Sequence, residues 1–337
     1  MKTIKILAIL GLWSLSIMGC SEKIDPTSTP VTPTTPTISA SSFFTDPIMK
    51  KANLISVSFA SDQTLFAFGN DANKGYLFKS TDLGKTWSEV NFSASNPIMQ
   101  SVSFKDEKVG ILNGKNVLGT IDGGTTWTLI SRPTDAQQTV YSKNQEGLVL
   151  MRLYDNFHSK KYTEVHSINT ANLSHSSYVT LGGYINDVYF LKDKLGIFVG
   201  DLGAIDVMMT KSDGTYDYID QIKPVNEDLL SVYLVSDKKA FVGGKNNTFL
   251  KTIDGGINWT IIKTGVIGNV AKLAFQNENL GYGIVIDGTK TLLYKIEEAG
   301  SKWTKITTPD TAVFNDLKIN SQGKAIAVGK DGGVYLF

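Results

Sequence analysis

Beyond about residue 40, the chain consists of short apolar runs separated by turn residues, and long amphipathic helical patterns are absent. The segment 230–263 is typical, with apolar runs at 230–234, 240–243, 248–251 and 259–263. Runs of this length between Gly-, Asn- and Asp-rich turns are characteristic of β-strands. The pattern therefore predicts an all-β fold of four-stranded antiparallel sheets.

One turn sequence recurs along this part of the chain. An apolar strand is followed by an Asp-Gly turn and a tryptophan that opens the next strand, most clearly in NTFLKTIDGGINWTII at 247–262. Copies occur at 80–87 and 120–127, and a looser one ends at Trp303. Four of the five tryptophans close such a turn, so the phrase marks a repeated β-hairpin.

The spacing of the repeat gives its number. Trp87 and Trp127 are 40 residues apart, Trp127 and Trp259 are 132 apart, and Trp259 and Trp303 are 44 apart, so two degenerate copies lie within the long interval. Apolar residues that end the first strand of each repeat give the same period. They are Phe59, Phe104, Phe190, Leu234, Phe275 and Ile319. The gap of 86 between Phe104 and Phe190 leaves room for one weak repeat, which makes seven. The predicted starts are near residues 55, 99, 136, 185, 229, 270 and 314.

Seven four-stranded sheets of this period predict a seven-bladed β-propeller over residues 38–337. The last repeat stops after three strands, which would leave an exposed edge. Residues 38–44 precede the first complete repeat and have no sheet of their own, so we expect this N-terminal segment to supply the missing strand and close the ring. An open array of stacked hairpins is the alternative.

The Ser/Thr-x-Asp-x-Gly-x-Thr-Trp phrase resembles the Asp-box, the repeat of bacterial neuraminidases. It is found in sialidases, sortilin-like receptors, xyloglucan-cleaving hydrolases and the photosystem II assembly-factor family. The length and motif of the repeats are most similar to those of the last of these. The resemblance implies a structural role at the blade periphery, with a calcium or catalytic role for the acids as the alternative. The residues concerned are Asp82, Gly84, Trp87, Asp122, Gly124, Trp127, Asp254, Gly256 and Trp259.

The N-terminal segment resembles a bacterial lipoprotein signal. Two lysines precede an apolar run too short to span a bilayer, and the run ends at Gly19 and the only cysteine, Cys20. The resemblance implies a signal peptide over 1–19 and lipid attachment at Cys20; an ordinary signal peptide with a chance cysteine is the alternative. Four of the nine prolines lie between residues 26 and 40, which favours an extended tether over 20–37. We therefore expect an exported protein, lipid-anchored at the outer membrane, with the face left open.

Composition excludes several classes of protein. Thirty-three basic residues against 32 acidic ones give a net charge of +1, so the protein lacks the positive electrostatic potential that attracts nucleic acid. A single cysteine permits no internal disulfide and no cysteine-based zinc site. We expect no cofactor, no metal and a monomeric body. The only arginines are Arg132 and Arg152, whereas the sialidase site needs three to grip a carboxylate.

Polar residues stand three positions before each strand-ending residue, at the start of the expected innermost strand. They are Ser56, Ser101, Asp187, Ser231, Lys272 and Asp316. We interpret Asp187, Lys272 and Asp316 as candidates for the mouth of a central channel. Asp187 and Asp316 as a catalytic carboxylate pair are the less favoured alternative, because the ring would separate them.

The weak third repeat is rich in aromatic and basic residues. Arg152, Tyr154, Phe157 and Tyr162 form a candidate interaction loop, although a hairpin carrying strand-facing aromatics is the favoured alternative. The three histidines, His158, His166 and His175, also lie here, and their spacing of 8 and 9 favours exposed loop residues over metal ligands.

Taken together, the sequence favours a non-catalytic binding, scaffold or assembly-factor-like propeller lipoprotein at the cell envelope, with a protein or glycan partner. A glycan-active hydrolase of the xyloglucan-cleaving Asp-box type is the alternative. Such enzymes commonly join two propellers into a cleft, and this chain has residues for one.

Overall fold

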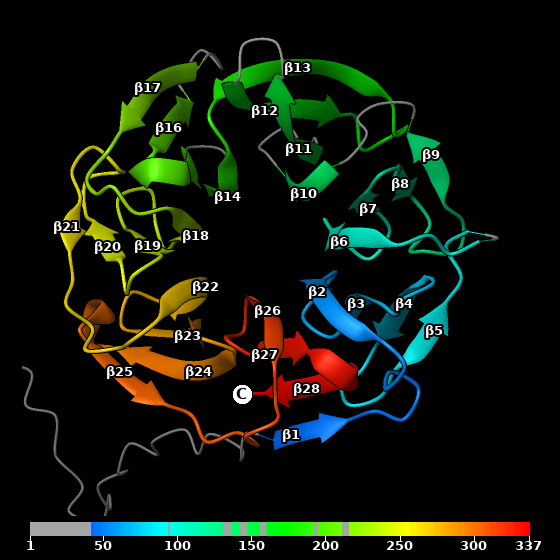
Figure 1. The fold of residues 1–337 in the computed structure, drawn as a ribbon. Coiled ribbons are helices and arrows are strands. Elements are labelled where there is room, and N and C mark those ends of the chain that lie inside the picture. Colours follow the sequence, from blue (N-terminus) through cyan, green and yellow to red (C-terminus); the bar gives the residue numbers. More distant parts are fainter. Residues whose placement is uncertain are drawn as a thin grey trace, which may run out of the picture. The chain divides into compact units, whose positions relative to one another are not determined.

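The computed structural model describes residues 42–93, 95–130, 136–141, 147–155, 160–191, 195–210 and 216–337. These residues form seven four-stranded antiparallel sheets around a common axis, as Figure 1 shows. Residues 39–337 belong to one compact unit. The predicted all-β propeller of four-stranded blades is confirmed.

The first four blades follow one another along the chain, each from its innermost to its outermost strand. Blade 1 contains β2 (Asn53–Phe59), β3 (Leu65–Asn70), β4 (Gly75–Ser80) and β5 (Ser88–Val90). Blade 2 contains β6 (Met99–Phe104), β7 (Gly110–Gly114), β8 (Val117–Thr120) and β9 (Thr128–Ile130). Blade 3 contains β10 (Ala136–Tyr141), β11 (Gly147–Asp155), β12 (Lys160–Ile168) and β13 (His175–Gly182). Blade 4 contains β14 (Ile185–Leu191), β15 (Leu195–Gly200), β16 (Ile205–Thr210) and β17 (Tyr216–Ile222).

The remaining three blades complete the ring. Blade 5 contains β18 (Leu229–Leu234), β19 (Ala240–Gly244), β20 (Phe249–Thr252) and β21 (Thr260–Ile261). Blade 6 contains β22 (Asn269–Asn277), β23 (Leu280–Asp287), β24 (Lys290–Glu297) and β25 (Lys302–Lys305). Blade 7 takes β26 (Phe314–Ile319), β27 (Ala325–Gly329) and β28 (Gly333–Leu336) from the C-terminal end and β1 (Ser42–Thr45) from the N-terminal end. Short 3-10 turns occur at η1 (Asp201–Gly203), η2 (Glu298–Gly300) and η3 (Lys330–Gly332).

The ring closes through β1. This strand pairs antiparallel with β28, with Phe43 opposite Tyr335 and Phe44 opposite Val334. The innermost strands contact one another in chain order, and β26 contacts β2 to complete the circle. The predicted closure by an N-terminal strand is thus confirmed, with the strand at 42–45; residues 38–41 lie outside the described residues.

Apolar layers between neighbouring blades hold the ring together. Phe66 of blade 1 stacks on Phe104 of blade 2, with ring centroids 3.7 Å apart and planes within 5°. The second strand of most blades is buried along its whole length, as in β15 and β27. Because these strands face a blade on each side, they read as continuous apolar runs instead of alternating ones.

A glycine on the second strand makes room for the strand-ending phenylalanine in three blades. Phe104 lies opposite Gly110, and Phe275 lies opposite Gly281. A Cβ added at Gly110 would come within 2.6 Å of the Phe104 ring, and one at Gly281 within 2.4 Å of the Phe275 ring. The same contact joins Phe190 and Gly196. These strand-ending phenylalanines, which were used to count the repeats, therefore need glycine at the opposite position.

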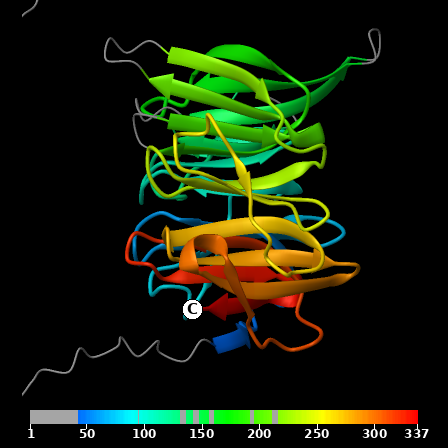
Figure 2. The same cartoon turned by 90° about the vertical axis from the view of Figure 1, so that its left-hand side faces the viewer.

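The edge-on view in Figure 2 shows strands running from one face of the ring to the other, so the turns gather on the two faces. The innermost strands surround the axis of the ring, and side chains from them line the space around that axis.

Candidate functional site

Two cavities lie along the axis of the ring. The larger, of about 350 Å³, is lined mainly by the inner strands β10, β14, β18, β22 and β26, and the smaller, of about 260 Å³, mainly by β2, β6 and β10. Both include Lys272 and Lys318 in their walls, so we describe them together as the axial channel. Of the candidate mouth residues, Asp187 lines the larger cavity, Asp316 the smaller one and Lys272 both.

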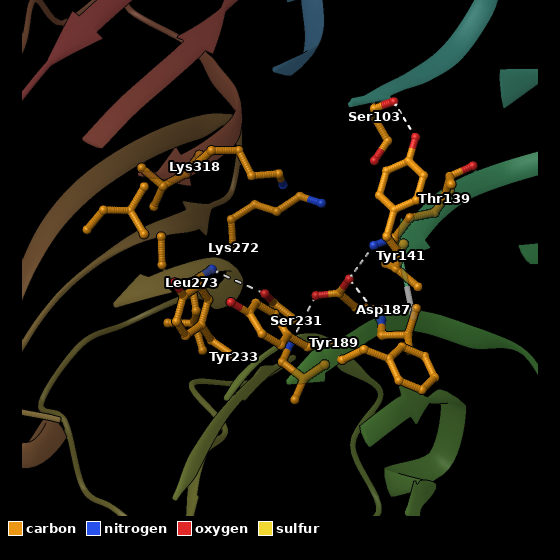
Figure 3. A pocket seen from close by; sticks show the side chains of 18 of the residues that line it. Ser103, Thr139, Tyr141, Asp187, Tyr189, Ser231, Tyr233, Lys272, Leu273 and Lys318 are labelled. Atoms are coloured by element: carbon orange, nitrogen blue, oxygen red, sulfur yellow. Dashed lines mark hydrogen bonds between the residues drawn. The ribbon is translucent and has the colours of Figure 1, made fainter. Parts of the chain in front are cut away.

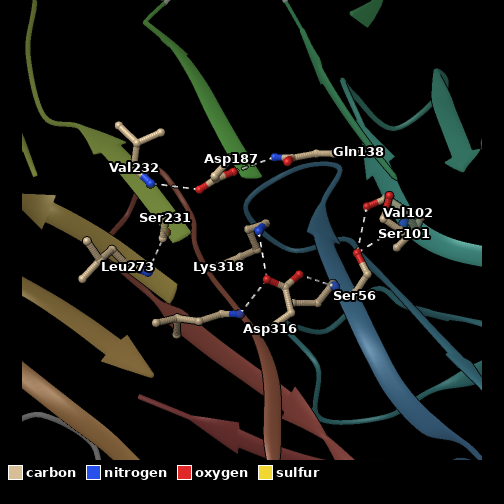
Figure 4. A network of polar contacts seen from close by, with 12 residues as sticks. Ser56, Ser101, Val102, Gln138, Asp187, Ser231, Val232, Leu273, Asp316 and Lys318 are labelled. Atoms are coloured by element: carbon tan, nitrogen blue, oxygen red, sulfur yellow. Dashed lines mark hydrogen bonds and ion pairs between the residues drawn. The ribbon is translucent and has the colours of Figure 1, made fainter. Parts of the chain in front are cut away.

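The acidic residues of the channel hold neighbouring inner strands together (Figure 4). Asp316 Oδ2 accepts a hydrogen bond of 2.9 Å from the Val57 amide, which joins blade 7 to blade 1. Asp187 Oδ2 likewise accepts one of 2.9 Å from the Val232 amide, which joins blade 4 to blade 5. Asp187 Oδ1 accepts two more, from Gln138 Nε2 of blade 3 and from the Val188 amide.

The serines of the same ring act in the same way. Ser56 Oγ accepts a hydrogen bond of 3.2 Å from the Val102 amide of blade 2, and Ser231 Oγ one of 3.2 Å from the Leu273 amide of blade 6. Ser101 Oγ donates to the Gln137 carbonyl of blade 3 at 2.9 Å. At every one of these positions except Lys272, the polar residue is therefore explained by backbone groups of the next inner strand, which do not meet a ladder partner on that side.

An ion pair lies in the channel wall between Asp316 and Lys318, with 3.1 Å between Oδ1 and Nζ. Burial by itself would raise the pKa of Asp316, but the charges of Lys318 and Lys272 and the Val57 amide outweigh it and hold that pKa below its usual range. Burial likewise opposes the charge on Lys318, and the carboxylates of Asp316 and Asp187 raise its pKa instead. The Asp316 side chain is 5% exposed and that of Lys318 46%, because the lysine projects into the open channel.

The larger cavity combines ammonium groups with aromatic walls (Figure 3). Lys272 and Lys318 extend into it from β22 and β26, and Tyr189 and Tyr233 line it from β14 and β18. The two tyrosine rings lie 4.6 Å apart between centroids. Tyr141 donates its hydroxyl to the Ser103 carbonyl at 2.9 Å, and burial raises the pKa of this phenol.

Several of these residues are absent from the set chosen from the sequence. Gln138, Lys318, Tyr189 and Tyr233 face the channel with the candidates. Tyr189 lies two positions after Asp187, Tyr233 two after Ser231 and Lys318 two after Asp316. Because alternate residues of a strand share a face, each of them faces the channel with its candidate. Extending each candidate by two residues along its strand would have found these three, whereas Gln138 lies in blade 3, where the sequence offered no candidate for the channel.

The acids of the tryptophan-closed turns are bound within their own turns. Asp122 Oδ1 accepts from the Thr126 amide at 2.9 Å and from Thr120 Oγ1 at 2.8 Å, and Thr126 Oγ1 donates to Oδ2 at 2.6 Å. Asp82 and Asp254 accept equivalent bonds in their own turns. These hydrogen bonds, led by the one from the Thr126 side chain, lower the pKa of Asp122 to about 2.

The glycine and tryptophan of each turn form a second unit. Gly84, Gly124 and Gly256 adopt positive φ angles of 82°, 88° and 93°. The indole Nε1 of Trp87, Trp127 and Trp259 donates to the carbonyl of the turn glycine, at 2.9, 3.1 and 2.9 Å respectively. The loose copy at Trp303 makes the same bond of 2.9 Å to Gly300.

These turns pack between blades. Trp87 belongs to a cluster that includes Ile326 and Val334 of blade 7. A Cβ added at Gly256 would lie 2.9 Å from Val207 of blade 4. The turn of one blade therefore covers the core shared with the preceding blade.

The candidate interaction loop of the third blade is wrong as a loop. Arg152 and Tyr154 lie in β11 and Tyr162 lies in β12, where Leu153 is paired with Tyr162. Phe157 lies outside the described residues. The described part is thus a long strand pair, in keeping with the hairpin alternative.

The exposed-loop interpretation of the histidines is wrong for His166. This side chain is buried on β12, with Nε2 2.9 Å from Glu164 Oε2 and Nδ1 2.9 Å from His175 Nε2. His175 begins β13, and His158 lies outside the described residues. Across the described ranges, no group of three or more His, Cys, Asp or Glu side chains is arranged to hold a metal ion.

Comparison with known proteins identifies the fold. The chain matches no known protein-family profile, and no curated protein is detectably similar in sequence. Among solved structures, "YCF48 bound to D1 peptide" superposes with a TM-score of 0.65 at 14% identity, covering 88% of this chain and 96% of that one. YCF48 from Cyanidioschyzon merolae gives 0.64 at 14% identity, covering 88% and 98%.

A third similar structure is that of an enzyme. Selenomethionine-substituted virginiamycin B lyase from Staphylococcus aureus superposes with a TM-score of 0.65 at 8% identity, covering 88% of this chain and 98% of that one. A peptide-bound protein and a lyase thus have this fold in common, so the comparison establishes the fold alone.

Proposed function

We propose that this protein is a non-catalytic binding propeller that serves as a scaffold or assembly factor. The observation that supports this most directly is that the channel carboxylates already accept hydrogen bonds within the ring. Asp187 and Asp316 each accept main-chain hydrogen bonds from a neighbouring blade. Asp316 is almost fully buried, and its lowered pKa keeps it ionised at neutral pH, which excludes it as the general acid of a glycosidase. The main-chain hydrogen bonds to both carboxylates argue against a nucleophile or base role for either one.

A protein partner is favoured over a glycan. One similar structure is YCF48 bound to a D1 peptide, and both YCF48 structures superpose on this chain over 88% of its length. The tryptophan-closed turns, which we assign to the Asp-box type, leave their acids occupied within the turn. We therefore place the recognition surface on the rest of the ring and propose a polypeptide as its ligand.

We further propose that the body is tethered to the outer membrane by lipid on Cys20. The proposal rests on the signal-like sequence before Cys20 and the proline-rich segment after it. Within the described ranges, no helix has the length and hydropathy needed to cross a membrane. Labelling with radioactive palmitate tests the anchor: the label should appear on the full chain and disappear in Cys20→Ala. Equal labelling of the two proteins would exclude this anchor.

Affinity capture from detergent-solubilised envelopes tests the binding function. Tagged full chain should retain a defined polypeptide partner in stoichiometric amount, and no reducing sugar should be released from a panel of plant and bacterial polysaccharides. Sugar release that is abolished by Asp187→Asn or Asp316→Asn would instead establish a glycan hydrolase and overturn the proposal.

A further inference from the structure

The axial channel contains a lysine whose ammonium takes no part in the hydrogen bonds between the blades. Lys272 is half-buried on β22 and lines both cavities of the channel. Within the part of the chain that the structure describes, its ammonium has no hydrogen bond or ion pair, whereas that of Lys318 pairs with Asp316. An ammonium carries three donors, so Lys272 presents unused donors and a positive charge to the cavity.

The channel carboxylates accept their hydrogen bonds from groups other than Lys272, although the charge of Lys272 acts on Asp316. Asp316 is bound by Lys318 Nζ and the Val57 amide, and Asp187 by Gln138 Nε2 and two main-chain amides. Both acids are therefore fixed in the wall, as Figure 4 shows for their contacts. The group that can move toward an incoming ligand is the flexible side chain of Lys272.

The wall beside the lysine is suited to a flat apolar group. Tyr189 and Tyr233 line the cavity next to Lys272, as Figure 3 shows, with their rings in mutual contact. Burial raises the pKa of both phenols, so they are neutral at physiological pH. A volume of about 350 Å³ lies within the size range of small-ligand sites.

We propose that this cavity binds a carboxylate joined to a flat apolar body. The carboxylate is held by Lys272 through a charge-assisted hydrogen bond, and the apolar body packs against the cavity side of the two tyrosine rings. Two sources can supply such a group: a small organic acid, or the C-terminal carboxylate of a chain ending in an aromatic residue. The inference concerns the axial cavity alone and goes beyond the proposed function, which assigns no ligand chemistry to that cavity.

Fluorine NMR with 4-fluorobenzoate tests the site on the purified full chain. The probe should show saturable line broadening, and 4-fluorobenzamide, which has the same shape without the charge, should not. Lys272→Met keeps the apolar stem and removes the charge, so it should weaken binding by about tenfold or more. The matched control is Lys290→Met, which removes an exposed lysine of the same blade and should leave binding unchanged.

The outcomes are distinct. Failure of the wild-type protein to bind 4-fluorobenzoate, equal binding of the benzamide, or unchanged binding by a folded Lys272→Met would each overturn the proposal. The comparison of benzoate with benzamide needs no variant, so it stands even if Lys272→Met does not fold. Displacement of the probe by Gly-Gly-Phe but not by its amide would assign the carboxylate to a chain end, and no displacement would assign it to a small acid. The NMR test uses the purified chain with the probe alone and no envelope partner, so its outcome is independent of the capture experiment for the binding function.

Discussion

At the scale of single residues, the aspartates of the tryptophan-closed turns have a structural role, because their carboxylate oxygens accept hydrogen bonds within the turn. Asp122 is a turn organiser, and so are Asp82 and Asp254. A similar device occurs in blade 1, where the Tyr76 hydroxyl donates to Asp71 at 2.6 Å and this bond, together with two main-chain amides, lowers the pKa of Asp71 to about 2. An acid whose oxygens already accept several donors is poorly placed to bind a substrate or a cation.

Asp122 gives a prediction for acid stability. Its pKa in the folded protein is about 2, below the value near 4 of an unfolded aspartate, so its contribution is complete above pH 4 and is lost as the pH falls toward 2. Asp122→Asn should therefore be less stable than wild type at pH 6, and the difference should shrink between pH 4 and pH 2. Thermal unfolding midpoints of both proteins across this range measure it. A constant difference would contradict the assignment, and Asp310→Asn, at an exposed position, is the control.

At the scale of elements, inner strands are joined by side chains that bind the backbone of the next blade. Ser56, Asp187, Ser231 and Asp316 each accept a main-chain amide across a blade boundary. Apolar layers supply the attraction between blades, and these bonds add directionality at the axis, where the ring is narrowest.

Asp316→Ala should destabilise the protein by about 2 kcal/mol, because the buried Val57 amide loses its acceptor. The lost ion pair adds little, since Lys318 is partly exposed and solvent screens it. Urea unfolding followed by circular dichroism gives the free energy. Asp316→Asn keeps an oxygen for Val57 and should cost less than the alanine variant. Equal stability of wild type and Asp316→Ala would show that this bond does not hold the blades.

At the scale of the whole propeller, one short strand decides whether the ring is closed. Removal of β1 would leave the backbone edge of β28 unpaired and uncover the clusters beneath Phe43 and Phe44. An exposed edge strand is a template for pairing with another chain.

A chain that starts at residue 46 should therefore lose about 3 kcal/mol of unfolding free energy and should self-associate, whereas a chain that starts at residue 39 retains β1. Urea unfolding and light scattering on the two proteins provide the comparison. A monomeric shorter chain with the stability of the longer one would show that β1 is dispensable for closure.

The sequence by itself determined the repeat and hence the architecture. The tryptophan-closed turns and the strand-ending phenylalanines recur because each blade must solve the same packing problem, so the period and the number of blades can be read from Trp87, Trp127 and Phe104 onward. Even the need for a closing strand follows, since an incomplete sheet at one end requires a complement from the other.

Only the tertiary structure decided what the polar residues do. Asp187 and Asp316 could have been a catalytic pair as far as the sequence goes, and their partners, the amides of Val232 and Val57, are 45 and 259 positions away along the chain. The segment around Arg152 looked like a loop because its long strands carry an unusual mixture of charged and aromatic residues. Repetition is a local property written in the order of residues, whereas hydrogen-bond partners and the walls of the axial cavity come from different blades and exist only once the ring has closed.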